Sequence, residues 1–119
     1  MYIACAVLSV PEENKQAYTE AADFMANWCM DRGALEVVEA WEKEVPDGKV
    51  TDYRSAVKAE DGEKIVTGWV IWPDKATFDK ANEALIAGEG MEGHPEGMPF
   101  DGSRLIYGCL LYTSDAADE

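Results

Sequence analysis

The sequence predicts an α+β domain whose elements follow the order strand, helix, strand, strand, helix, strand. The clearest strand is residues 65–72, which read Ile-Val-Thr-Gly-Trp-Val-Ile-Trp and end at Pro73. Such a short run of β-branched and aromatic residues is typical of a buried strand. Apolar residues also recur at steps of three and four after residues 12 and 74, as in two amphipathic helices. Residues 2–10, 35–41 and 103–112 provide the other three predicted strands.

In the first half of the chain, residues 2–10 are apolar on both faces, and Pro11 ends this strand. The acidic residues that follow suit a helix N-terminus, and Gly33 suits a helix stop. The next strand, residues 35–41, places Glu39 on the same face as three apolar residues, Leu35, Val37 and Trp41. A carboxylate in that position is either a buried base with a raised pKa or a group at the solvated edge of the sheet.

In the second half, residues 43–63 form an excursion between two turns, and residues 65–72 follow as the central strand. Asp74 is a good N-cap for the second helix, which Gly88 and Gly90 terminate. Residues 91–102 are rich in Gly and Pro and predict a loop that carries the only histidine, His94. The whole order is the ferredoxin-like βαββαβ arrangement, an antiparallel four-stranded sheet with both helices on one face.

This arrangement has a consequence for assembly. The central strand is apolar on both faces, whereas two helices cover only one face of a sheet. Fully burying one large apolar side chain contributes about 1.5–3 kcal/mol, and monomers rarely expose a patch of such groups. The sequence therefore predicts a homodimer that pairs through the uncovered sheet face.

Composition narrows the class of protein. A length of 119 residues predicts a single domain, which we place at residues 1–112, followed by a frayed tail at 113–119. The net charge of −14 argues against partners such as nucleic acids and anionic membrane surfaces. No signal-like or membrane-spanning stretch is recognisable, so we expect a cytoplasmic protein. The three cysteines lack metal-site spacing and each lies in an apolar run, which predicts buried, inert thiols.

The best polar constellation is Asp101 with Arg104, near His94. Its functional interpretation is a pair that anchors a ligand at the mouth of a pocket, with His94 exchanging protons near neutral pH. Its structural interpretation, which we favour, is a turn at Asp101 that Arg104 stabilises. The basic side chain of Lys58 suits either an anionic ligand or pairing with one of the chain's many acidic residues. The aromatic side chains of Trp69 and Phe100 suit core packing or stacking on a flat substrate.

Several strings resemble the YbaA-like family of bacterial proteins of unknown function. They are Val45-Pro46-Asp47-Gly48-Lys49-Val50-Thr51, Ala56-Val57-Lys58 and, most distinctive, Met98-Pro99-Phe100-Asp101-Gly102. The resemblance covers about residues 1–108 and implies a dimeric α/β barrel, a superfamily that includes monooxygenases and haem-degrading enzymes. Residues 109–119 depart from the family and look like translated sequencing-adapter read-through of the kind found in metagenomic gene predictions. We therefore expect residues 109–119 to be non-native.

Three functions remain open from the sequence. The first is binding of a small molecule between sheet and helices, against a set of ligand-binding residues: Glu39, Lys58, Trp69, Phe100, Asp101 and Arg104. The second is a cofactor-independent monooxygenase or isomerase in which His94 or Glu39 takes a proton from carbon. The third is a structural or interaction dimer without catalysis. No phosphate loop, dinucleotide fingerprint or metal-spaced cluster is present, so we expect no cofactor and no metal.

Overall fold

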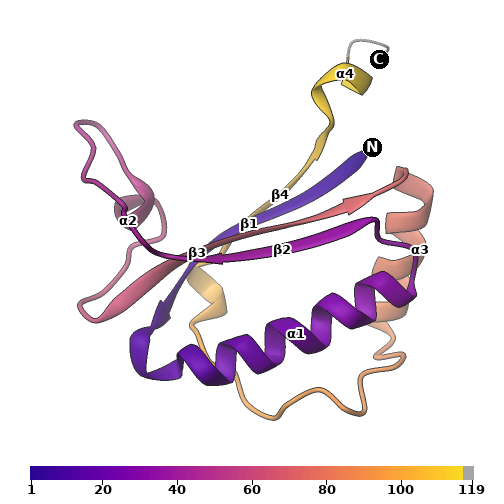
Figure 1. Cartoon of the computed structure of the whole chain (residues 1–119), viewed down its shortest axis with the longest axis horizontal. Coiled ribbons are helices and arrows are strands. Elements are labelled where there is room, and N and C mark those ends of the chain that lie inside the picture. The colour runs from indigo at the N-terminus through magenta and orange to yellow at the C-terminus, as the bar shows by residue number, and fades with distance from the viewer. Residues whose placement is uncertain (117–119) are drawn as a thin grey trace.

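A computed structural model describes residues 1–116 of the chain, and Figure 1 shows one antiparallel sheet with the two long helices on one side. The strands are β1 (Tyr2–Pro11), β2 (Glu36–Trp41), β3 (Glu63–Trp72) and β4 (Ile106–Leu111), and they lie in the order β2-β3-β1-β4. The two long strands occupy the centre and pair over their full length, from Tyr2 opposite Trp72 to Pro11 opposite Glu63. The predicted α+β class and the four-stranded antiparallel sheet are confirmed.

The main helices are α1 (Lys15–Asp31), which follows the 3-10 turn η1 (Glu12–Asn14), and α3 (Lys75–Ile86). Their predicted boundaries hold for physical reasons. Gly33 has a φ of +102°, which an L side chain rarely adopts, and it ends α1. The carboxylate of Asp74 accepts the backbone N–H of Thr77 at 2.8 Å and begins α3.

The shorter elements are α2 (Tyr53–Ala56), η2 (Gly102–Arg104) and α4 (Thr113–Ala116). The last strand begins at Ile106 rather than 103, because Asp101 caps η2 by accepting the backbone N–H and the hydroxyl of Ser103. One turn of helix, α4, follows β4, and residues 117–119 of the predicted frayed tail lie outside the described residues.

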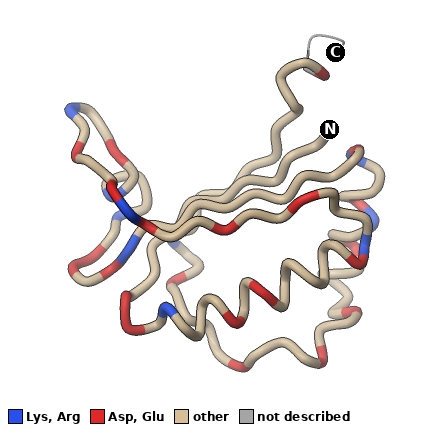
Figure 2. Tube along the Cα trace, in the orientation of Figure 1, with Lys and Arg blue, Asp and Glu red and all other residues tan. Residues whose placement is uncertain are grey.

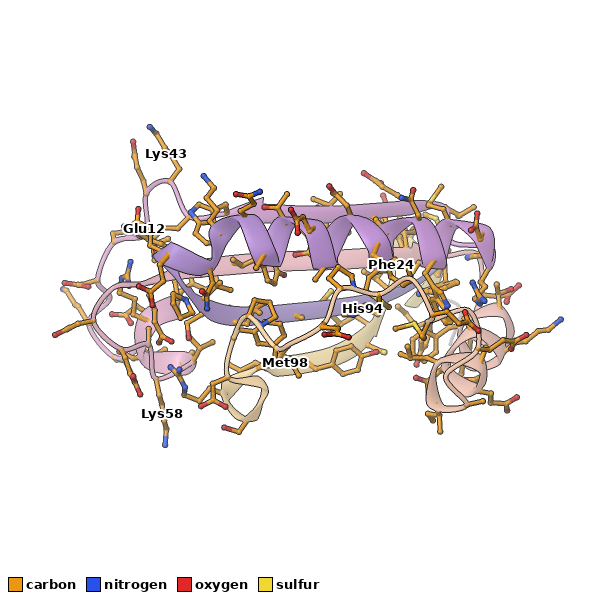
Figure 3. All side chains as sticks on the ribbon, turned by 90° about the horizontal axis from the view of Figure 1, so that it is seen from below. Glu12, Phe24, Lys43, Lys58, His94 and Met98 are labelled. Atoms are coloured by element: carbon orange, nitrogen blue, oxygen red, sulfur yellow. The ribbon has the colours of Figure 1, made fainter. Side chains whose placement is uncertain are left out.

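The core lies between the sheet and the two main helices. Trp28 and Cys29 of α1, Ala81 of α3 and Trp72 of β3 form one buried cluster. A second cluster, towards the other end of α1, joins four buried residues: Leu8, Val10, Tyr18 and Val66. Figure 3 shows α1 running along the sheet while α3 lies at one end of it, with the connecting segment around His94 and Met98 alongside α1.

The opposite face of the sheet, which we call the open face, is uncovered by any helix of residues 1–116 (Figure 1). Its rows follow from the register: Trp69 lies between Cys5 and Val38, and Val7 lies beside Ile106. Trp69 is 38% exposed, Ile106 43% and Leu110 57%. Trp69 and Trp72 are three residues apart in β3, so they point to opposite faces, and only Trp72 reaches the core.

Charge is distributed unevenly over these elements. Figure 2 shows little charge along the middle of the sheet, and β1 and β4 contain no charged residue. The charges lie instead on the helices, on β2, at the start of β3 and in the segment between α3 and β4. They also lie on the 43–62 excursion, which projects from one end of the sheet. Among the described residues, no helix has the length and hydrophobicity needed to cross a lipid bilayer.

Candidate functional site

A cavity of about 220 Å³ lies between the sheet and the helices, and we call it the sheet–helix cavity. Its aromatic walls come from every layer of the fold: Trp28 of α1, Trp72 of β3, Phe78 of α3 and Tyr107 of β4. Almost all the remaining lining is aliphatic. Among residues 1–116, the carboxyl group of Glu39, on β2, is the single acidic group in the lining. Such a mostly apolar cavity with few polar groups is the usual form of a small-molecule site.

The carboxyl group of Glu39 is held in place from two sides. Its Oε2 accepts a hydrogen bond from the hydroxyl of Tyr18 at 2.7 Å. It also lies over the backbone of Gly68 in β3, where an added Cβ would come within 2.9 Å of Oε2. Gly68 thus permits the close approach of the carboxyl group to the central strand.

Glu39 has two environments at once. As a residue of the edge strand β2 it is exposed to solvent, whereas its carboxyl group folds inward over Gly68 and is partly desolvated. This desolvation raises the pKa of Glu39, and the hydrogen bond from Tyr18 offsets part of the shift. Burial and the neighbouring Glu39 together raise the pKa of Tyr18. The site therefore holds a proton-accepting carboxyl group against a neutral phenol.

Of the other predicted site residues, Phe100 lies nearest to this pair. Its ring packs edge-on against Tyr18, with centroids 5.8 Å apart. Trp69 lies on the open face, on the far side of the sheet from the cavity. The structure thus brings Phe100 into the surroundings of Glu39 and separates Trp69 from them.

The basic and acidic candidates form a different cluster, away from the cavity. Arg104 donates to both oxygens of Glu63 at 2.7 Å, to the carboxylate of Asp101 at 3.1 Å and to the backbone oxygen of Lys58 at 2.8 Å. The same guanidinium reaches the buried hydroxyl of Ser9 at 3.2 Å. All three side-chain nitrogens of Arg104 therefore have partners within the chain, in agreement with the structural interpretation of the Asp101–Arg104 pair.

This cluster has clear electrostatic effects. The hydrogen bonds from Arg104 lower the pKa of Glu63 from 4.5 to about 2. The pKa of Asp101 is also lowered, first by its hydrogen bonds from Ser103 and then by Arg104. The arrangement locks the 102–104 turn onto the start of β3 and leaves little of Arg104 for a ligand.

The remaining two candidates are widely separated in the structure. Figure 3 places Lys58 at one end of the molecule and His94 near Phe24, towards the other end. Lys58 is exposed and adopts a φ of +52°. The ring of His94 packs edge-on against Phe24 at 5.2 Å, and its Nδ1 lies 2.7 Å from the backbone oxygen of Pro95. His94 is thus anchored in its loop, apart from the Asp101–Arg104 pair.

A larger groove of about 600 Å³ lies between the ends of α1 and α3. It is open and lined by charged residues of both signs, including Arg32, Lys80 and Glu83. Arg32 already stacks on Trp28 at 4.0 Å and donates to backbone oxygens. We favour the smaller sheet–helix cavity, because its apolar walls and inward carboxyl group provide a specific chemistry that a solvated groove lacks.

The potential metal ligands and the three cysteines are considered next. Across residues 1–116, no three His, Cys, Asp or Glu side chains are close enough together to hold a metal ion. Cys29 is buried, and burial raises the pKa of its thiol. Cys5 and Cys109 are only partly buried, because Cys5 lies on the open face and Cys109 lies on the edge strand β4. The prediction of three buried thiols is therefore correct for Cys29 alone.

Two residues of this site, Tyr18 and Gly68, have roles that the sequence alone does not predict. Tyr18 recurs at helical spacing with the apolar residues of the first helix, so its hydroxyl gives no separate signal in the sequence. Gly68 offered a signal: an isolated glycine within a strand marks a bulge or a close approach of another group. The sequence also places the carboxylate of Glu39 among apolar neighbours. The two signals can be connected only once the pairing of β2 with β3 is known, because that pairing sets Glu39 opposite Gly68.

Comparison with known proteins places the chain in a family. Residues 1–102 match the family described as "Protein of unknown function (DUF1428)". The chain belongs to this family. It is also 46% identical over 107 residues to the "Uncharacterized protein YbaA" of Escherichia coli K12, covering 90% of this chain and 92% of that protein, and equally to the protein of the same name from Shigella flexneri. The resemblance predicted from the Met98–Gly102 region is thereby confirmed at the level of the family.

The family match ends before the segment 109–119 that we predict to be non-native. In the structure, residues 109–111 complete β4 opposite Tyr2, Ile3 and Ala4. Sequencing the source gene independently tests the prediction, and an identical tail there would refute it.

Proposed function

We propose that this protein binds a small, largely apolar organic molecule in the sheet–helix cavity. The observation that carries the proposal is the carboxyl group of Glu39, which is desolvated at the wall of an aromatic cavity and fixed by Tyr18. A desolvated carboxylate reduces stability unless it is compensated, so its place at a cavity wall suits recognition of a ligand. A second support is Trp72, whose buried indole N–H has no acceptor among residues 1–116 and whose ring lines the same cavity.

A thermal-shift screen with a library of small aromatic and aliphatic fragments tests this proposal. A ligand at ten times its Kd stabilises the folded state by about 1.4 kcal/mol, which raises the Tm of a domain this size by several degrees. Ala26 lines the cavity, and Ala17 is exposed on the same helix. We expect Ala26→Leu to remove the shift by filling the cavity and Ala17→Leu to retain it. Fragment shifts that survive in Ala26→Leu, or a library without any stabilising member, would contradict the proposal.

Proton transfer is a second candidate function, favoured by the raised pKa of Glu39. A carboxylate with a raised pKa is a stronger base, and an apolar cavity suits abstraction of a proton from an activated carbon. Glu39 would take the proton in this scheme, since His94 packs against Phe24 rather than at the cavity. Incubating carbon acids with the protein in D₂O discriminates the two functions: enzyme-dependent deuterium incorporation, lost in Glu39→Gln, supports catalysis, and its absence leaves binding alone.

We also propose that the domain has the ferredoxin-like arrangement and pairs through its open face into a dimeric α/β barrel. The support is the exposed apolar surface on that face, which includes Trp69, Ile106 and Leu110. A non-catalytic interaction dimer is the function that remains if the cavity binds no ligand.

A further inference from the structure

We propose that the ligand of the sheet–helix cavity is a small protonated amine with an aromatic body, whose ammonium group pairs with the carboxylate of Glu39. This inference rests on the proposed binding function and names the chemical class that the cavity selects.

The charge balance of the sheet is the first argument. Two other carboxylates at the β2 and β3 strands have arginine partners: Glu42 pairs with Arg54 at 2.5 Å and Glu63 pairs with Arg104 at 2.7 Å. Within residues 1–116, Glu39 has no Lys or Arg side chain within 4.0 Å. Among residues 1–116, the side chain of Glu39 accepts one hydrogen bond, from the neutral phenol of Tyr18. A partly desolvated carboxylate without a counter-charge attracts a cation more strongly than a fully solvated carboxylate does.

The walls of the cavity provide the second argument. Trp28, Trp72, Phe78 and Tyr107 line it, and no Lys or Arg does. Aromatic rings attract cations through the negative charge of their faces, and they also pack against a flat apolar body. An anionic ligand would meet the carboxylate of Glu39 without any basic residue to offset the repulsion. The lining thus favours a cation over an anion, and an aromatic cation over a purely polar one.

The volume of the cavity sets the size of the ligand. The cavity has a volume of about 220 Å³. An apolar cavity of about 150 Å³ is already sufficient to bind benzene. The cavity therefore has room for a single ring with a short chain, such as a phenethyl group.

Isothermal titration calorimetry with three probes of similar shape tests the inference on the unmodified protein. The probes are 2-phenylethylamine, which is cationic at neutral pH, 2-phenylethanol, which is neutral, and phenylacetate, which is anionic. We expect the amine to bind at least tenfold more tightly than the alcohol, and phenylacetate to show no detectable binding.

Two variants of the same strand supply the matched comparison. Glu36 is exposed on β2 and lies opposite Ile71 on the open face, whereas Glu39 faces the cavity. We expect Glu39→Gln to weaken amine binding at least tenfold while leaving the affinity for 2-phenylethanol within twofold. Glu36→Gln should change neither affinity, because it removes an equal charge without touching the cavity.

The outcomes separate this inference from the proposed function. Alcohol or phenylacetate binding as tightly as the amine, or amine binding unaffected by Glu39→Gln, would overturn the inference and leave the binding function intact. Amine binding reduced equally by Glu36→Gln would overturn it as well, since only the overall negative charge would then be at work. If fragments of other classes stabilise the protein and no amine does, the inference alone fails.

Discussion

At the scale of single residues, the ion pair of Glu63 and Arg104 is the most fully satisfied polar group of the fold. The side chain of Glu63 is 7% exposed, and Arg104 donates to both of its oxygens. Removing one partner of such a pair leaves the other charge buried without compensation, which costs far more than losing an exposed pair. The chain contains a natural contrast in Lys75 and Asp79, which pair in solvent at the surface of α3.

We therefore expect Glu63→Gln to lower the free energy of unfolding by about 3 kcal/mol, and Asp79→Asn to lower it by about 0.5 kcal/mol or less. Urea unfolding monitored by tryptophan fluorescence measures both. The pKa of Glu63 is lowered from 4.5 to about 2, so its contribution is present above pH 4.5 and is lost as the pH falls towards 2. The wild type should lose more stability than Glu63→Gln across that interval. Parallel losses in the two proteins would show that the pair is not buried as described.

For Glu39, the dependence of stability on pH has the opposite sign. Its pKa is raised in the folded protein by desolvation, so the folded state holds its proton more tightly than the unfolded state. Stability from this group therefore falls as the pH rises above its ordinary value of 4.5. At neutral pH we expect Glu39→Gln to be more stable than the wild type in urea unfolding, with the difference vanishing at acid pH. A Gln variant less stable at neutral pH would mean that the carboxylate is compensated within the protein.

The sequence indicated these residues unequally. Asp101 and Arg104 are three positions apart, so local spacing was enough to suggest their pairing. Glu63 is 41 positions from Arg104 and Tyr18 is 21 from Glu39. Such partners are brought together by sheet register and helix packing, which local periodicity does not contain. The sequence therefore leaves two environments for Glu39, a buried site or the solvated edge of the sheet, and only the positions of Tyr18 and Gly68 in the structure distinguish them.

At the scale of the elements, β3 carries the site because it is the strand that both β1 and β2 use for pairing. Its alternation was readable from the sequence, since its two faces are both apolar. The role of Gly68 could not be predicted in this way, because the carboxyl group that occupies the space beside it comes from the neighbouring strand β2. An added Cβ at Gly68 would lie 2.9 Å from the carboxyl oxygen of Glu39 and 2.9 Å from the backbone oxygen of Val38.

We expect Gly68→Ala to lower the free energy of unfolding by about 1–3 kcal/mol, the range for overpacking, and to weaken ligand binding by displacing the carboxyl group. Gly102 in η2 is the control, because a Cβ there would meet side-chain atoms only at 3.9 Å, an ordinary van der Waals distance. Chemical unfolding and fragment thermal shifts of the two alanine variants provide the comparison. Equal stability and unaltered binding in Gly68→Ala would argue that the carboxyl group does not lie over the central strand.

At the scale of the whole molecule, the two faces of the sheet differ in how far they are covered. The helix-facing side holds the core and the cavity, and the open face carries apolar side chains in the described structure. Sequence periodicity predicted that helices would cover one face only, because two amphipathic helices are too few for a sheet that is apolar on both sides. It did not predict which of Trp69 and Trp72 lies on the uncovered face, since that depends on which face the helices occupy.

Pairing through the open face predicts that Trp69→Asp disrupts the dimer, because a charge would be buried at the centre of the interface. Ile86→Asp is the control: Ile86 is 80% exposed on α3, away from that face. Sedimentation velocity at micromolar concentration should show dimers for the wild type and Ile86→Asp, and monomers for Trp69→Asp. A wild type that sediments as a stable monomer would refute the pairing, and with it the need to cover the open face.

The binding of a small molecule beside Glu39 is tested most directly by the indole N–H signals of the tryptophans in a ¹H–¹⁵N NMR titration. Trp28 and Trp72 line the sheet–helix cavity, whereas Trp69 lies on the opposite face. With the fragment that gives the largest thermal shift, we expect the signals of Trp28 and Trp72 to move while that of Trp69 stays in place. Movement of the Trp69 signal alone, with Trp28 and Trp72 unperturbed at saturation, would contradict a ligand site between the sheet and the helices.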